Sequence, residues 1–298
     1  MLLKAQGLPA DAVFLDLEDA VAPGAKEAAR GNVVSALKDG DWGGKTVSVR
    51  VNDLTTAWTY RDVIAVVEGA GAALDCLIVP KVRSAHDVRW IDVLLTQVES
   101  ATGLEVGRIG IEVQIEDAAG LQSVDQIAVA SPRVQSLVFG PADFMASVNM
   151  RSLVVGEQPT GYDVGDAFHY VLFRILVAAR AAGVQAIDGP YLAVHDLDGL
   201  RRSARRSAAL GFDGKWVLHP AQVDPVNEVF TPSQEDFDRA EAVLTAYEHA
   251  TSQAGGMRGA VMFGDEMIDE ASRKMASVVS AKGRAAGLTR PAQPPERP

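Results

Sequence analysis

Short apolar runs rich in β-branched residues alternate along the chain with longer amphipathic stretches. The short runs are typical of strands in a buried parallel sheet and the longer ones of helices that cover it, so we expect the α/β class. The pattern predicts strands near residues 13, 47, 76, 111, 137, 185 and 216, with helices at about 25–37, 58–69, 86–100, 121–129, 166–182 and 196–210. Seven strands are one fewer than a (β/α)8 barrel requires, and the alternation alone does not fix how such a sheet closes.

The pattern changes after residue 230. A predicted helix follows Ser233 and runs to about Thr251, and Gly255-Gly256 then interrupts the pattern like a hinge. A further helix is predicted at 266–282, and we interpret the hinge and this helix as a lid. We therefore expect a barrel catalytic domain (1–230), a C-terminal helix and lid segment (231–288) and a Pro-rich disordered tail (289–298).

Composition narrows the classes of partner and compartment. The 298-residue chain is 48% hydrophobic, enough for a full core, and its net charge of −11 argues against a nucleic-acid partner or an anionic membrane surface. Its single cysteine, Cys76, excludes a disulfide framework and is expected to be a buried inert thiol, because it lies in an apolar run. Without a signal-peptide pattern or a run of roughly 18 apolar residues, the chain is expected to be soluble and cytoplasmic.

Two of the predicted strands lead into a carboxylate. Glu116 follows the run IGIEVQI, and Asp143 follows LVFGPA. The carboxyl ends of neighbouring parallel strands meet at one rim, and two hard oxygen ligands there suit Mg²⁺, which usually keeps waters and substrate oxygens as its other ligands. The alternative is that each acid only caps the helix after its strand.

Other charged residues also follow predicted strands. Glu18 and Asp19 come after the first strand, Arg50 lies near the end of TVSVRV, and Lys81 follows the third strand. A guanidinium matches a carboxylate in bidentate geometry, so Arg50 is a candidate anchor for an acidic substrate. Two alternatives remain, which are an ion pair between Arg50 and a rim acid, and solvated helix-start positions for Glu18 and Asp19.

With these residues assembled, the chain resembles the citrate lyase β-subunit-like and malyl-CoA lyase family, acyl-CoA lyases of the HpcH/HpaI aldolase superfamily. The resemblance runs from Lys4 to about Val278 and rests on ADAVFLDLEDAV, RVN, VPK, QIEDAAGL, FGPADF, AIDGPY, LGFDGKWVLHPAQV and FTPS. It implies a TIM (β/α)8-type barrel with a C-terminal helical lid. Members of the family begin with an additional strand that has no counterpart here. The expected barrel therefore lacks its first strand, and either the native chain starts upstream of Met1 or this is a shortened form.

The resemblance further implies a Mg²⁺-dependent enzyme, with Mn²⁺ as a substitute and no nucleotide or flavin cofactor. Its substrates would be a CoA thioester and a 2-oxo acid. By position, Glu116 and Asp143 match the metal ligands of the family, and Arg50 matches the arginine that binds the substrate carboxylate. Glu18 and Asp19 match the acids that hold metal-bound water, and Lys26 and Arg30 match a region near the CoA phosphates. Asp269 of the lid matches an acid/base aspartate.

Retro-Claisen cleavage of a 3-hydroxyacyl thioester requires a base for the hydroxyl proton, a Lewis acid and stabilisation of the acyl-CoA enolate. Arg50 and Asp269 are the expected catalytic residues. Gly140, Pro141 and Ala142 are expected to bind substrate, and backbone N–H groups around Gly140 to Asp143, near a helix start, are expected to take carboxylate oxygens. We expect cleavage of L-malyl-CoA or β-methylmalyl-CoA to glyoxylate and acetyl-CoA or propionyl-CoA, by a homo-oligomer (trimer or hexamer). The alternatives are a citrate lyase β subunit within a multi-subunit complex, a citramalyl-CoA lyase, a malyl-CoA thioesterase and, less favoured, a sugar-acid aldolase.

Overall fold

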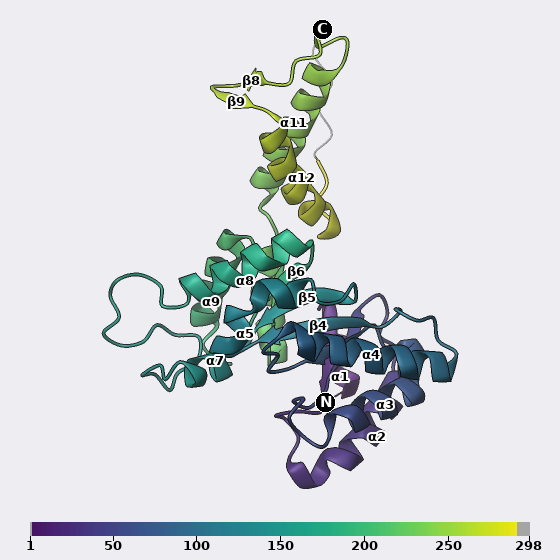
Figure 1. Cartoon of the computed structure of the whole chain (residues 1–298). Coiled ribbons are helices and arrows are strands. Elements are labelled where there is room, and N and C mark those ends of the chain that lie inside the picture. Colours follow the sequence, from purple (N-terminus) through teal and green to yellow (C-terminus); the bar gives the residue numbers. More distant parts are fainter. Residues whose placement is uncertain (1, 291–298) are drawn as a thin grey trace. The chain divides into compact units, whose positions relative to one another are not determined.

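A computed structural model describes residues 2–290 of the chain (Figure 1). These residues divide into two compact units, the first ending at Asn227 and the second beginning at Glu228, and each is described by itself. The division falls within α10 (Val223–Phe230), next to the boundary predicted after residue 230.

The first unit is built on one parallel sheet whose strands pair in the order in which they occur in the chain. The strands are β1 (Ala12–Asp16), β2 (Thr46–Arg50), β3 (Cys76–Val79), β4 (Gly110–Ile115), β5 (Val134–Phe139), β6 (Gln185–Asp188) and β7 (Gly214–Lys215). Between residues 2 and 290, no strand pairs with the outer side of β1 or β7. The predicted α/β sheet of barrel type, one strand short of eight, is confirmed.

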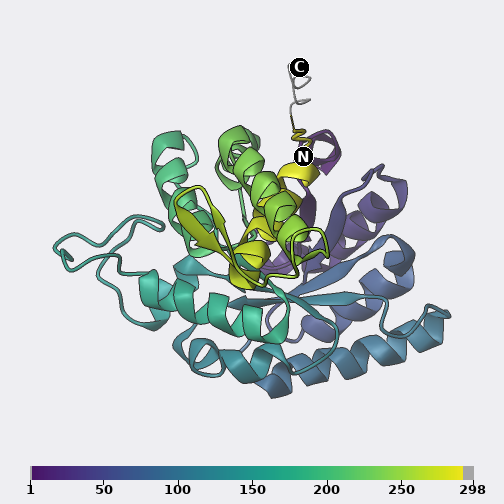
Figure 2. The same ribbon diagram turned by 90° about the horizontal axis from the view of Figure 1, so that it is seen from above.

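The outer face of this sheet is apolar and helices lie along it (Figure 2). Val49 of β2, Leu77 of β3 and Val113 of β4 are fully buried on this side, and each such side chain contributes roughly 1.5–3 kcal/mol. The longer helices of the unit are α2 (Lys26–Asp39), α3 (Thr59–Ala70), α4 (Ala85–Thr102), α8 (His169–Ala182) and α9 (Leu197–Leu210). Shorter elements are α1 (Leu2–Gln6), η1 (Pro23–Ala25), η2 (Gly71–Ala73), α5 (Ala118–Gln122), α6 (Val124–Ala128), α7 (Pro141–Ser147) and η3 (Pro220–Gln222).

The inner face of the sheet is polar in its middle. Ser48 and Ser136 both donate hydrogen bonds to the carboxylate of Glu112 on β4, at 2.5 and 3.2 Å. Cys76 lies on the same face and is buried, and burial raises the pKa of its thiol to about 12, in keeping with the predicted inert cysteine.

The two outer strands of the sheet contact each other through an aromatic stack. Phe14 of β1 and Trp216, directly after β7, stack with ring centroids 4.4 Å apart. The side-chain amide of Asn227 adds a hydrogen bond of 2.6 Å to the carbonyl of Pro9, just before β1. The sheet therefore curls until its outer strands face each other, although no backbone ladder joins them.

Three predicted elements have different bounds for local reasons. The helix predicted at 121–129 is split into α5 and α6 at Ser123, which ends one and precedes the other. The helix predicted from 166 begins at His169, because the Asp166 carboxylate accepts the N–H of Phe168 ahead of the helix. The last strand, predicted near residue 216, ends at Lys215, and the N–H of Leu218 donates to the side chain of Gln222 instead of to β6.

The second unit contains α11 (Gln234–Thr251), a hairpin of β8 (Val261–Phe263) and β9 (Glu266–Ile268), and α12 (Glu270–Ala285). Tyr247 and Ile268 belong to its small apolar core. The helix predicted at 266–282 starts only at Glu270, because the preceding residues pair with β8. Gly255 and Gly256 lie inside this unit, in the turn after α11, where a Cβ on Gly255 would overlap the backbone of α11 and Gly256 has a φ of +82°.

The predicted disordered tail covers 289–298, and its residues 291–298 lie outside the described part of the chain. Across residues 2–290, none of the helices combines the length and the apolar character that crossing a bilayer requires.

Candidate active site

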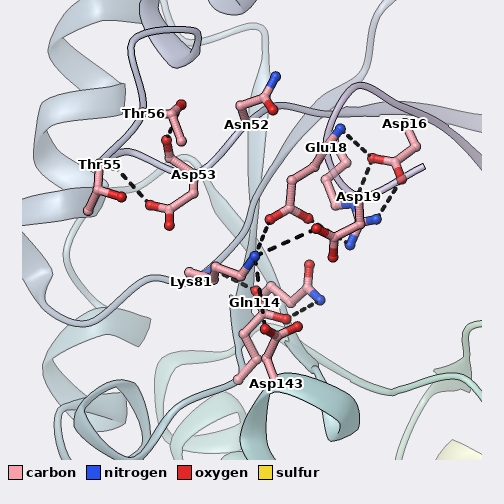
Figure 3. A network of polar contacts seen from close by, with 12 residues as sticks. Asp16, Glu18, Asp19, Asn52, Asp53, Thr55, Thr56, Lys81, Gln114 and Asp143 are labelled. Atoms are coloured by element: carbon pink, nitrogen blue, oxygen red, sulfur yellow. Dashed lines mark hydrogen bonds and ion pairs between the residues drawn. The ribbon is translucent and has the colours of Figure 1, made fainter. Parts of the chain in front are cut away.

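Charged side chains from five consecutive strands meet at the carboxyl end of the sheet (Figure 3). Glu18 and Asp19 follow β1 and Lys81 follows β3, while Asp143 lies in the first turn of α7 after β5. Figure 3 shows the ammonium group of Lys81 between the two acids after β1 on one side and Asp143 on the other. The parallel order of the strands thus brings together residues far apart in the sequence.

Lys81 is the cation at the centre of this group. Its Nζ lies 2.7 Å from Glu18 Oε1, 3.8 Å from Asp19 Oδ1 and 3.9 Å from Asp143 Oδ1. Although burial opposes its charge, these acids raise its pKa. Its φ of +52° is unusual for a residue with a side chain, and such strain persists only where surrounding contacts impose it.

Glu116 is a buried carboxylate that accepts hydrogen bonds from two neutral donors. It is 2% exposed, and its Oε1 accepts the backbone N–H of Lys81 at 2.7 Å while its Oε2 accepts the side-chain amide of Gln114 at 2.6 Å. Burial, together with the negative charges of Asp143 and Glu18, raises the pKa of Glu116 to about 8. A carboxylate so placed is stabilised in its charged form by an added cation.

Arg50 is fixed at the end of β2 by the acids of β1. Its Nε and Nη2 donate to the two oxygens of Asp16 at 2.8 and 2.5 Å, and its Nη1 lies 3.1 Å from Glu18 Oε2. Burial opposes the ionisation of Asp16, but hydrogen bonding and the charge of Arg50 lower its pKa overall. Arg50 therefore forms the ion pair with a rim acid that was considered as an alternative. The same ion pair holds its guanidinium at the rim.

Glu116 and Asp143 provide hard oxygen atoms, the kind of ligand that Mg²⁺ binds. Residues 2–290 contain no group of three or more His, Cys, Asp or Glu side chains arranged to hold a metal. Mg²⁺ commonly takes only one or two carboxylates from a protein and fills its octahedron with waters and substrate oxygens. Buried Glu116 and Asp143, whose side chain is 41% exposed, supply such a pair of hard oxygen ligands, so the residues fit the ion.

Lys26 and Arg30, predicted near the CoA phosphates, have partners within the protein. The ammonium of Lys26 is buried and donates to the carbonyls of Leu17 and Glu18 at 2.8 and 2.7 Å. Arg30 pairs with the fully buried Asp62 at 2.6 Å. The contacts of Lys26 fix the segment that carries Glu18, and binding of CoA phosphates by the two cations stays a prediction.

The backbone contacts predicted at the start of α7 need a correction. Gly140 donates its N–H to the carbonyl of Ile115 at 3.0 Å, and Pro141 has no N–H group. Gly140 therefore cannot give the predicted backbone contact to a substrate. The N–H groups of Ala142 and Asp143 keep that role as a prediction, and substrate binding at Pro141 also stays a prediction. Gly140 has a different function, because a Cβ there would overlap Glu116.

Asp269 belongs to the second unit, where it caps α12. Its Oδ1 accepts the backbone N–H groups of Ala271 and Ser272 at 2.9 and 3.1 Å. The hydrogen bond from Ser272 is the main reason why the pKa of Asp269 is lowered. Its predicted acid/base role stays a prediction.

Two polar residues on the inner face of β4, Gln114 and Glu112, were not predicted. The segment IGIEVQIE was interpreted as an apolar run that ends in an acid. The signal was present in the strict alternation of that segment, in which Glu112, Gln114 and Glu116 share one face and the isoleucines and Val113 share the other. A polar stripe of this kind indicates a strand whose second face lines a site.

The sequence of this chain is similar to those of known proteins. Residues 1–220 match the family model described as HpcH/HpaI aldolase/citrate lyase. A relative named L-malyl-CoA/beta-methylmalyl-CoA lyase, from Cereibacter sphaeroides, is 42% identical over 278 residues, which cover 91% of this chain and 86% of the relative.

Solved structures show the same likeness. The protein CitE of Mycobacterium tuberculosis, in complex with magnesium, acetoacetate and coenzyme A, is 30% identical with a TM-score of 0.70, covering 92% of this chain and 90% of that one. A citrate lyase from Burkholderia xenovorans LB400 is 24% identical with a TM-score of 0.79, covering 94% and 85%, and supports the fold alone. The chain belongs to the HpcH/HpaI aldolase/citrate lyase family, as its motifs predicted.

Proposed function

We propose that this protein is a Mg²⁺-dependent carbon–carbon lyase that cleaves a 3-hydroxyacyl-CoA such as L-malyl-CoA or β-methylmalyl-CoA. The products are glyoxylate and acetyl-CoA or propionyl-CoA. The observation that carries the proposal is the buried carboxylate of Glu116, surrounded by neutral donors and further acids, beside Asp143. The relative named as a malyl-CoA lyase and the magnesium and coenzyme A in the CitE structure support the substrate class and the ion.

Glu116 and Asp143 hold the cation in this proposal, and Mn²⁺ is expected to replace Mg²⁺. When bound, the ion supplies Lewis-acid stabilisation of the charge that develops on the leaving 2-oxo acid. Lys81 adds a fixed positive charge and keeps Glu18 in place through the 2.7 Å contact, so that Glu18 and Asp19 can accept hydrogen bonds from bound water. Arg50 has N–H groups beyond those given to Asp16, and these bind the substrate carboxylate or the enolate oxygen.

The proton of the substrate hydroxyl requires a base. Asp269 is proposed for this role, because by position it matches the acid/base aspartate that the family resemblance implies. Its position directly after β9, at the first turn of α12, places it on the lid segment proposed for residues 231–288.

The test is an assay of the purified chain with L-malyl-CoA, β-methylmalyl-CoA and citramalyl-CoA in Mg²⁺ and in EDTA. We expect glyoxylate and a free acyl-CoA, no turnover in EDTA, and a loss of about three orders of magnitude in Glu116→Gln, because several kcal/mol of transition-state stabilisation disappear. Malate without glyoxylate would indicate a thioesterase, and turnover of citramalyl-CoA alone would change the substrate. Normal turnover of Asp143→Ala in EDTA would refute the metal site.

We also propose a cytoplasmic homo-oligomer, a trimer or hexamer. Tyr170, Phe173 and Val177 form an exposed apolar stripe at helical spacing on α8, next to the projecting loop between α7 and α8, where Leu153 is fully exposed (Figures 1 and 2). Light scattering of the intact chain should give three or six copies. Phe173→Glu should shift the mass toward the monomer, whereas Glu68→Gln, an unrelated surface change, should not.

A further inference from the structure

The amide oxygen of Gln114 is a buried acceptor beside the proposed metal ligands. Gln114 lies on the inner face of β4 and is 4% exposed. Its Nε2 donates to Glu116 Oε2 at 2.6 Å, while its Oε1 is buried and has no hydrogen-bond partner within residues 2–290. Leaving such an acceptor unpaired is unfavourable, so the group indicates a donor that comes from a ligand.

The orientation of this amide follows from its neighbour. With a cation bound, Glu116 is ionised and only accepts hydrogen bonds, so the NH₂ end of Gln114 faces Glu116 and the oxygen points the other way. The backbone of Gly140 lies against the Nε2 end of the amide, since a Cβ on that residue would lie 3.0 Å from Nε2. The acceptor is therefore held in one direction next to the Glu116 carboxylate.

We propose that Gln114 Oε1 accepts a hydrogen bond from an O–H group bound to the cation at Glu116 and Asp143. This assignment rests on the proposed function. An O–H group polarised by a divalent cation is a strong hydrogen-bond donor. The acceptor belongs to the same side-chain amide whose Nε2 contacts Glu116, a proposed metal ligand. Two sources share this chemistry, which are a coordinated water and the 3-hydroxyl of the substrate.

Two substitutions separate the acceptor from the donor of the amide. Gln114→Met removes both, whereas Gln114→Glu keeps an oxygen acceptor and removes the N–H donated to Glu116. Glu112→Gln, two residues away on the same face, is the control, because Glu112 is served by Ser48 and Ser136 instead. Binding of Mn²⁺ is measured by electron paramagnetic resonance without substrate, and malyl-CoA turnover is measured separately.

If the donor is coordinated water, Gln114→Met weakens Mn²⁺ binding about tenfold to a hundredfold, and Gln114→Glu does not. If the donor is the substrate hydroxyl, Mn²⁺ binding is unchanged, and kcat/KM for malyl-CoA falls about tenfold to a hundredfold in Gln114→Met. In that case succinyl-CoA, the analogue without the hydroxyl, has the same inhibition constant for Gln114→Met as for the unsubstituted protein. Glu112→Gln is expected to match the unsubstituted protein in Mn²⁺ binding and in malyl-CoA turnover, because Glu112 contacts Ser48 and Ser136 rather than the proposed ligands.

Three results separate failure of this assignment from failure of the proposed function. Equal behaviour of Gln114→Met and the unsubstituted protein would overturn the role of the acceptor. Equal impairment of Gln114→Met and Gln114→Glu would leave only the contact of Nε2 with Glu116 and would also overturn it. An unsubstituted protein that neither binds Mn²⁺ nor cleaves malyl-CoA would overturn the proposed function, and this assignment with it.

Discussion

Two glutamates on the inner face of β4 are stabilised in different ways. Glu116 at the rim has neighbouring acids and suits a cation, whereas Glu112 deeper in the sheet has only the hydroxyl groups of Ser48 and Ser136. Burial raises the pKa of Glu112 despite these two hydrogen bonds. Its charged form is therefore less favourable in the folded protein than in the unfolded chain.

This difference predicts a pH dependence of stability. An acid with a raised pKa contributes no penalty below its ordinary value of 4.5, and it lowers the free energy of unfolding as the pH rises through the folded pKa. Glu112→Gln should therefore have nearly the melting temperature of the parent at pH 4 and a higher one at pH 9. A higher melting temperature of the parent than of Glu112→Gln at pH 9 would contradict the raised pKa of Glu112.

Arg50 offers a second test at the scale of one residue. Lysine keeps the charge but cannot make the bidentate contact with Asp16, so Arg50→Lys should lower the free energy of unfolding by about 1–3 kcal/mol. If Arg50 also binds substrate, turnover should fall far beyond this loss of stability. Asp16→Asn separates the two roles, because it breaks the same ion pair and leaves the guanidinium in place. Equal activities of the two variants would refute the substrate contact.

At the scale of elements, the turn from β5 into α7 controls the position of Glu116. Gly140 brings the backbone so close that any side chain there would push against Glu116, and its N–H fixes the turn on Ile115. Gly140→Ala should cost about 1–3 kcal/mol of stability and weaken Mg²⁺ binding, measured by calorimetry. Gly24→Ala is the matched control, since a Cβ there meets nothing within 4 Å, and its effect should stay within about 0.5 kcal/mol. Unchanged Mg²⁺ affinity in Gly140→Ala would contradict this role of the turn.

At the scale of the whole molecule, the residues proposed for the chemistry belong to two compact units. The proposed metal ligands belong to the first unit and Asp269 to the second. Asn caps helices about as well as Asp, so Asp269→Asn should keep the fold and CoA binding but lose turnover. Mixing the Asp269→Asn and Glu116→Ala proteins tests whether the lid closes over a neighbouring copy. If it does, the mixture should recover part of the activity. No recovery in subunits shown to exchange would leave closure within one chain.

The family and the strand order of the sheet could be predicted, and the contacts at the rim could not. Strand runs, the acids that follow them and the motifs around Glu116 and Asp143 are local features of the sequence. Lys81 appeared only as another charge after a strand, but its backbone conformation places its N–H on Glu116 and its ammonium on Glu18. The partners of Lys26 and Arg30 were missed for the same reason, since they lie on other elements.

The sequence by itself determined the α/β class, the parallel sheet one strand short of eight, the family and the pair of acids at the rim. These follow from periodicity and from residues adjacent in the chain. Only the tertiary structure decided which charges neutralise each other, that Gly140 gives its N–H to Ile115, that β8 and β9 pair ahead of α12, and that Gln114 keeps an unpaired oxygen beside Glu116. The physical reason is that desolvation, hydrogen bonding and close packing depend on neighbours that folding brings together from distant positions.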